Sequence, residues 1–198
     1  MQTKTKFITS ILFLISFSIT AQISLDTFPD FELKNIEGEA VKSETLINPE
    51  KETLILLYGS YGNPCNKSVT ILNELRSSWS KNHKLDIKVV ALDGNKSQKW
   101  LEINGKSDNS FFDDSKFFID KVGIKGCPLI LVYSPNKKIL YGKNGFIHEE
   151  QQRDNLISEI NYQRALKTTK TGVIEINYDN GNLHYYRTVK NQMLNGRT

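Results

Sequence analysis

The chain has 198 residues, of which 38% are hydrophobic and 24% are charged, and its formal net charge is +4. This length suits one domain with additional segments. The positive charge is small and scattered along the chain, which argues against nucleic acid as a partner.

Residues 1–21 have the composition of a secretory signal peptide. Lys4 and Lys6 form a basic start, Ile8–Ile19 is an apolar run, and Ala21 is a small residue at the expected cleavage point. The apolar run is shorter than the ~20 residues that a membrane span needs. Cleavage would remove two lysines and no acid, lowering the net charge from +4 to +2. We therefore expect a periplasmic or secreted protein without an integral membrane span.

The next part of the chain predicts strands and one long helix. Residues 28–35 predict a short alternating strand, followed by a turn at Gly38. Thr53–Ser60 predicts a buried strand, and Pro64–Lys81 predicts a helix because its apolar residues recur at helical spacing. Leu85–Asp93 predicts a second buried strand.

The pattern continues with short helices and a hairpin. In chain order we expect a helix at Asn95–Asn104, a loop through Ser107–Ser110, a helix at Ser115–Val122, strands at Leu129–Tyr133 and Ile139–Tyr141, and a final helix at Glu149–Lys167. Strands that alternate with helices are typical of α/β proteins.

Two short motifs connect this pattern to a known family. Residues 58–65 read YGSYGNPC, and residues 126–128 read Gly-Cys-Pro. The first resembles the W-x-x-W-C-x-P-C active-site turn of the thioredoxin superfamily, with Tyr58 and Tyr61 at the two tryptophan positions. The second resembles its cis-proline loop, and residues 28–39 resemble the opening of exported TlpA/ResA-like thiol–disulfide oxidoreductases. The resemblance implies a thioredoxin-like fold over residues 26–167, with a mixed central sheet flanked by helices and a cis bond before Pro128.

The active-site turn departs from the family pattern at one position. Gly62 stands where the family has its attacking cysteine, and Asn63 and Pro64 lead to Cys65, which corresponds to the second cysteine. The nucleophile of thiol–disulfide exchange is a thiolate, so the ordinary dithiol cycle cannot run on this motif.

The chain's other cysteine is Cys127, between Gly126 and Pro128. The resemblance implies that the two loops lie together, so Cys65 and Cys127 form either a reversible redox pair or a structural staple. In a further alternative Cys65 is a small buried packing residue.

Other chemistries lack their required residues. A peroxiredoxin needs Thr or Ser three residues before its reactive cysteine, and Gly62 stands there. His83, His148 and His184 show no metal-ligand spacing, so we expect no metal and no cofactor. The buried acid of thioredoxins aligns with Leu56, which leaves no evident local base.

The tail, residues 168–198, is polar and rich in Asn and Gly. It resembles a single MORN-type hairpin repeat, with tight-turn signals at 179–181 and 195–196. A lone hairpin is marginal in water, so we expect it to dock on the preceding domain or to belong to an incomplete array.

Two functions remain. One is thiol–disulfide exchange, or a redox-partner role, with protein thiols or disulfides as partners of Cys65 and Cys127. The other is a non-catalytic module that binds an extended peptide segment or an envelope protein through the cis-proline loop and its groove.

Overall fold

The computed structural model describes residues 25–59, 62–94, 109–168, 172–177 and 183–189. Its elements in chain order are β1 (Glu32–Asn35), β2 (Ala40–Lys42), the 3-10 helix η1 (Ser43–Leu46), β3 (Glu52–Tyr58), α1 (Asn63–Asn82), β4 (Leu85–Ala91), β5 (Ser110–Phe112), α3 (Phe117–Asp120), β6 (Leu129–Tyr133), β7 (Ile139–Asn144), α4 (Glu150–Thr168), β8 (Gly172–Asn177) and β9 (Leu183–Val189).

The main sheet has seven strands in the order β2-β1-β5-β4-β3-β6-β7. Strands β3, β4 and β5 run parallel to one another, and the remaining neighbours are antiparallel. The sheet is therefore mixed, as the sequence predicts.

Strand β3 is buried on both faces because it lies in the middle of this sheet. Leu54, Leu56 and Tyr58 face a core that α1 and α4 complete, whereas Ile55 and Leu57 face a second core. A strand covered on both faces reads as a continuous apolar run instead of an alternating one.

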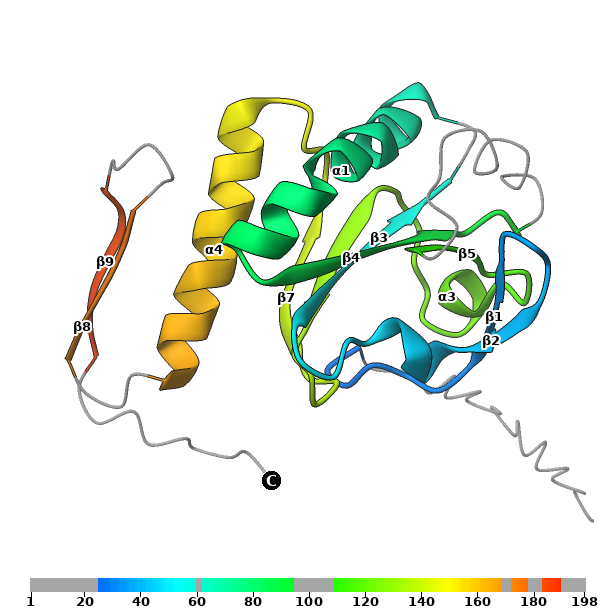
Figure 1. Cartoon of the computed structure of the whole chain (residues 1–198), viewed down its shortest axis with the longest axis horizontal. Coiled ribbons are helices and arrows are strands. Elements are labelled where there is room, and N and C mark those ends of the chain that lie inside the picture. The colour runs from blue at the N-terminus through cyan, green and yellow to red at the C-terminus, as the bar shows by residue number, and fades with distance from the viewer. Residues whose placement is uncertain (1–24, 60–61, 95–108, 169–171, 178–182, 190–198) are drawn as a thin grey trace, which may run out of the picture.

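The two cores are closed by different parts of the chain. The first takes Val69, Leu72 and Trp79 from α1, together with Leu156 and Ile160 from α4. The second is completed by η1, α3 and the segment before β1. In Figure 1, α1 and α4 lie next to one another and α3 lies apart from them.

The structure corrects two predicted elements between β4 and β6. Ser110 was expected to end a loop, but residues 110–112 form β5, which is too short to show an alternating pattern. The helix expected at Ser115–Val122 has only residues 117–120, because the Asp113 carboxylate accepts the backbone N–H groups of Phe117 and Phe118 and fixes its start there. The helix expected at 95–104 lies outside the described residues.

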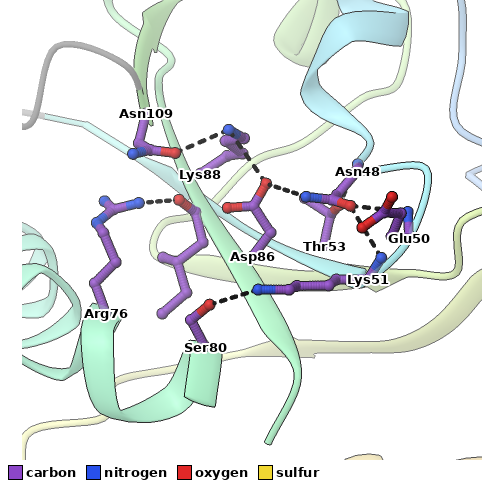
Figure 2. A network of polar contacts seen from close by, with 10 residues as sticks. Asn48, Glu50, Lys51, Thr53, Arg76, Ser80, Asp86, Lys88 and Asn109 are labelled. Atoms are coloured by element: carbon purple, nitrogen blue, oxygen red, sulfur yellow. Dashed lines mark hydrogen bonds and ion pairs between the residues drawn. The ribbon is translucent and has the colours of Figure 1, made fainter.

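A polar network closes the end of the sheet at which β3 and β4 begin (Figure 2). Asp86 lies 3.3 Å from the Lys88 ammonium and accepts a hydrogen bond from Asn48. Lys51 donates to the Ser80 hydroxyl across 3.1 Å and so ties the start of β3 to α1.

Strands β8 and β9 form a separate antiparallel hairpin, in which Gly172 pairs with Val189. The hairpin lies beside α4 (Figure 1). A hairpin in the tail agrees with the sequence, but both predicted turns, 179–181 and 195–196, lie outside the described residues. The MORN-like assignment stays a prediction.

Candidate functional site

The first turn of α1 brings Cys65 to the end of the sheet where β3 ends. Gly62 is the residue before the helix, Asn63 begins it and Pro64 follows, a position at which proline is well tolerated. The Cys65 N–H donates to the Gly62 carbonyl across 2.9 Å, which closes this turn. The Cys65 side chain is buried, whereas Asn63 and Pro64 are exposed; Tyr61 lies outside the described residues.

The loop before β6 carries the second cysteine. Gly126 is exposed, Cys127 is half-buried and Pro128 is buried, and the Cys127–Pro128 peptide bond is cis, as the sequence predicts. The Gly145 N–H donates to the Pro128 carbonyl across 3.0 Å, which joins this loop to the segment between β7 and α4.

The two sulfur atoms lie next to one another. Cys65 Sγ and Cys127 Sγ are 3.0 Å apart, and both residues are free thiols. Only 4% of Cys65 is exposed, so Cys127 is the more accessible member of the pair. A Cβ atom added at Gly62 would lie 3.6 Å from Cys65 Sγ, an ordinary contact distance. There is room for a side chain at position 62, so steric crowding does not explain why this residue is a glycine.

The surroundings of Cys65 keep it protonated. Burial, followed by the hydrogen bond and the charge of Cys127, raises the pKa of the Cys65 thiol to about 11. A backbone hydrogen bond from Gly59 acts in the opposite direction on this pKa, and the charge of Asp93 raises it. At neutral pH Cys65 is thus a thiol and not a nucleophilic thiolate.

His148 is a site residue that sequence reasoning missed. Its Nε2 atom lies 2.8 Å from the Pro64 carbonyl oxygen and 3.2 Å from the hydroxyl of the buried Ser68. Because a carbonyl oxygen can only accept, Nε2 carries the hydrogen. The His148 ring stacks on Phe146, with ring centroids 5.1 Å apart, and Phe146 is 42% exposed. No local pattern could have placed His148 here, because it lies 84 residues from Pro64 in the chain.

A shallow hollow of about 470 Å³ lies beside the cis-proline loop. Its lining is mainly apolar and consists of Leu92, Ile119, Gly123, Ile124, Lys125 and Gly126. Because Gly126 directly precedes Cys127, a chain bound in this hollow would pass next to the accessible thiol.

The part of the chain that the structure describes contains neither a cluster of metal-ligating residues nor a helix that could cross a membrane. There, no three residues among His, Cys, Asp and Glu lie close enough together to hold a metal ion. Within the same ranges, no helix combines the length and apolar character that a transmembrane segment needs.

No family model and no curated protein matches this sequence. Solved structures do match. A thioredoxin-like protein from Porphyromonas gingivalis is 23% identical, with 67% of this chain and 88% of that chain covered and a TM-score of 0.54. A putative thiol:disulfide interchange protein DsbE from Chlorobium tepidum is 23% identical, with 68% and 93% covered and a TM-score of 0.56.

A third match is the peroxidoxin BcpB from Mycobacterium tuberculosis. It is 16% identical, 68% of this chain and 94% of that chain are covered, and the TM-score is 0.56. Identities this low establish the fold alone. Together with the mixed sheet and its flanking helices, they show that this chain has a thioredoxin-like fold.

Proposed function

We propose that this protein carries out thiol–disulfide exchange with Cys65 and Cys127 as its dithiol pair. One observation carries the proposal: the only two cysteines of the chain, far apart in sequence, have their sulfur atoms 3.0 Å apart. In this proposal the accessible thiol lies in the cis-proline loop, at Cys127, and not in the turn at Gly62.

The unequal burial of the two thiols assigns their roles. Cys127 is half-buried and can be reached by a substrate, whereas Cys65 is buried and its pKa is raised to about 11. Cys65 keeps its proton at neutral pH, so its thiol can donate a hydrogen bond to Cys127 Sγ, 3.0 Å away. Cys127 is therefore the attacking thiol and Cys65 the resolving one.

The reaction balances without a cofactor. The Cys127 thiolate attacks one sulfur of a substrate disulfide, and the other substrate sulfur leaves as a thiolate. Cys65 then loses its proton and attacks Cys127 Sγ, which releases the second substrate thiolate and leaves a Cys65–Cys127 disulfide. The substrate is reduced by two electrons and the protein is oxidised by two. The reverse sequence would oxidise a substrate dithiol.

The names of the structural neighbours and the start of the chain support this proposal. One neighbour is described as a putative thiol:disulfide interchange protein and another, from Bacteroides thetaiotaomicron, as a putative protein disulfide isomerase. Residues 1–21 would export the chain to an oxidising compartment, where such a pair exchanges with protein thiols. Residues 26–167 would be the redox domain, and residues 168–198 an appended MORN-like hairpin.

The hollow beside Gly126 favours a second candidate function. Its mainly apolar lining next to the cis-proline loop suits an extended peptide held without chemistry. In that case the two thiols would remain reduced or form a permanent staple, and the protein would bind its partner in either redox state.

Single-cysteine variants test the exchange reaction and the order of attack. We expect Cys65→Ser to accumulate a stable mixed disulfide between Cys127 and glutathione or a peptide disulfide, because the resolving thiol is gone. We expect Cys127→Ser to form little mixed disulfide, because Cys65 is buried and protonated. Mass spectrometry of acid-quenched samples measures both. Equal reactivity of the two variants would contradict the assigned order.

The wild-type protein provides the test of the function itself. We expect it to reach a Cys65–Cys127 disulfide in glutathione redox buffers and to return to two thiols as the buffer becomes more reducing. Two thiols that stay freely alkylated in oxidising buffer would overturn the exchange reaction and favour the peptide-binding function.

A further inference from the structure

The short loop between β7 and α4 contacts both segments that carry a cysteine. At one end of this loop, the Gly145 N–H donates to the Pro128 carbonyl across 3.0 Å. At the other end, His148 Nε2 lies 2.8 Å from the Pro64 carbonyl oxygen. Pro128 directly follows one cysteine and Pro64 directly precedes the other. The loop therefore joins the cis-proline loop to the first turn of α1.

The peptide unit that links Pro64 to Cys65 is hydrogen-bonded at both of its polar groups. Its carbonyl oxygen accepts the His148 Nε2 hydrogen across 2.8 Å and a hydrogen bond from the Ser68 hydroxyl across 3.2 Å. Its N–H group donates to the Gly62 carbonyl across 2.9 Å. Because a peptide unit is planar, holding both groups fixes the plane that leads to the Cα atom of Cys65.

Among these three hydrogen bonds, the one from His148 comes from a distant part of the chain. Gly62 and Ser68 lie at the start and in the second turn of α1, so they move together with this helix. His148 is 84 residues from Pro64 in sequence and precedes α4. Its hydrogen bond therefore holds the first turn of α1 against the rest of the domain.

The loop that carries His148 is itself anchored. Ile147 is 2% exposed and packs in the core that α1 and α4 complete. Arg153 in α4 donates from Nη1 to the His148 carbonyl across 2.9 Å and to the Ile147 carbonyl across 3.3 Å. Gly145 has a φ of 132°, which favours glycine at the point where the loop leaves β7. The backbone of His148 is thus tied to α4 and to the core.

The resolving step depends on how closely the two sulfur atoms are held. Cys65 Sγ has to attack Cys127 Sγ, which lies 3.0 Å away, so a movement of the first turn of α1 changes the distance between the reacting atoms. Holding two groups in place raises their effective concentration, and a displacement of about 1 Å can lower a rate by about 100-fold. A contact that fixes this turn therefore acts on the reaction without touching either sulfur.

We propose that His148 is a positioning residue, which holds the Cys65 turn beside Cys127 by donating a hydrogen bond to the Pro64 carbonyl. This inference rests on the proposed function and adds the contact that sets the geometry of its thiol pair. In the step concerned, the Cys65 thiolate attacks Cys127 Sγ, a Cys65–Cys127 bond forms, and the bond from Cys127 to the substrate sulfur breaks as the substrate leaves as a thiolate. The proton released by Cys65 passes to the solvent, and His148 exchanges neither a proton nor an electron.

His148→Phe and His148→Gln separate the hydrogen bond from the packing of the ring. Phenylalanine keeps an aromatic ring beside Phe146 but has no donor, whereas glutamine keeps an N–H donor and has no ring. The full chain is reacted with glutathione disulfide, and acid quench with mass spectrometry follows formation and resolution of the mixed disulfide separately. We expect His148→Phe to slow resolution about 10-fold and to leave formation unchanged, because formation uses Cys127 alone. His148→Gln should keep most of the wild-type resolution rate.

The redox equilibrium gives a second readout, which a general loss of stability does not move while the protein stays folded. In glutathione redox buffers, His148→Phe should lower the equilibrium constant for the Cys65–Cys127 disulfide about fivefold, the effect of one typical hydrogen bond. Arg164→Ala is the matched control, because it removes an ion pair with Glu52 at the opposite end of the sheet. We expect this control to lower the free energy of unfolding and to leave the redox equilibrium unchanged. Circular dichroism checks the fold, and His148→Ala serves as a second donor-free variant if His148→Phe does not fold.

The outcomes distinguish this inference from the function on which it rests. Unchanged resolution and an unchanged redox equilibrium in His148→Phe overturn the role of His148 and leave thiol–disulfide exchange intact. A loss in His148→Gln as large as that in His148→Phe also overturns it, because the hydrogen bond would not be the cause. An equal shift of the redox equilibrium in Arg164→Ala overturns it as well. A wild-type protein that forms no mixed disulfide and no Cys65–Cys127 disulfide overturns both.

Discussion

The two ends of the central sheet are built in opposite ways. Where β3 and β4 begin, charged side chains are paired: Asp86 with Lys88, and Glu52 with Arg164, whose guanidinium also donates to the His83 carbonyl across 2.7 Å. Where β3 ends, the sulfur atoms of two free cysteines lie 3.0 Å apart, one residue buried and the other half-buried.

The difference indicates that the groups that stabilise the fold and the groups of the proposed reaction lie at opposite ends of the sheet. At one end an ion pair joins α4 to β3, and hydrogen bonds join α1 to β4 and to the start of β3; these contacts involve no thiol. At the other end lies the thiol pair of the proposed reaction, with Cys127 accessible and Cys65 buried and protonated. Substitutions at the two ends should therefore have different consequences.

The largest effect is expected for Arg164→Ala at the paired end. Arg164 Nε donates to Glu52 across 2.5 Å, and about a quarter of Arg164 and a fifth of Glu52 are exposed, with side-chain values of 27% and 18%. Removing one partner of a largely desolvated pair leaves the other charge unpaired, so we expect the free energy of unfolding to fall by about 2–3 kcal/mol. Urea denaturation measures it.

The matched control for Arg164→Ala is Lys34→Ala, which breaks an ion pair with Asp114 whose side chains are 46% and 36% exposed. An exposed pair contributes much less to the free energy of unfolding than a largely desolvated one. The thiol–disulfide equilibrium should be the same in both variants. A changed equilibrium in Arg164→Ala would show that the two ends are coupled.

Gly62→Cys should turn the thiol end into an ordinary dithiol turn. The new Cβ would lie 3.6 Å from Cys65 Sγ and meet no closer atom, so a second cysteine fits at the start of α1. We expect disulfide reduction of insulin to rise at least several-fold, since the helix start favours a thiolate. Gly62→Ser is the matched control. A wild-type rate equal to that of the variant would show that the pair with Cys127 is already as effective.

The ionisation of Cys65 gives a pH-dependent test. In the wild type its pKa lies near 11, with burial as the main cause and Cys127 as the second. In Cys127→Ala, alkylation should give a pKa below 11 but still above that of an exposed thiol, because burial remains. A return to the ordinary thiol value would show that Cys127, and not burial, controls this ionisation.

The raised pKa of Cys65 also makes the stability of the folded protein depend on pH. Because the folded state binds the Cys65 proton more tightly than the unfolded chain does, its contribution is fully present below the ordinary thiol pKa. It is lost as the pH rises toward about 11. Wild-type protein should therefore lose more stability over this alkaline range than Cys65→Ala does, measured by urea denaturation at a series of pH values.

The smallest effect is expected for His148→Ala. This change removes the hydrogen bond to the Pro64 carbonyl and the contact with Ser68, which should cost about 1 kcal/mol. Amide hydrogen exchange should accelerate in the first turn of α1 and stay unchanged at its C-terminal end. His148→Gln, which keeps a donor, should restore part of the protection. Uniform acceleration along α1 would instead indicate a global loss of stability.

Much of the fold follows from local patterns. The run of apolar residues in β3 and the helical spacing of Val69, Leu72 and Trp79 predict their elements, because buried faces repeat with the period of the element. Strand β5 was not predicted, because three residues are too few to show a periodic pattern. Its pairing with β4 forms only in the folded chain.

The candidate site is less predictable than the fold. The two motifs identify Cys65 and Cys127, and the family resemblance implies that their loops meet. His148 has no motif, because it reaches the site only through the packing of a distant segment, the loop before α4.

The sequence by itself determined the candidate residues: it contains two cysteines, and its resemblance to the thioredoxin superfamily implies that Gly62 stands at the position of that superfamily's attacking cysteine. Only the tertiary structure decided that their sulfur atoms lie 3.0 Å apart, with Cys65 buried and Cys127 accessible. Thiol reactivity depends on solvation and on neighbouring charges, and both are set by contacts between segments far apart in the chain.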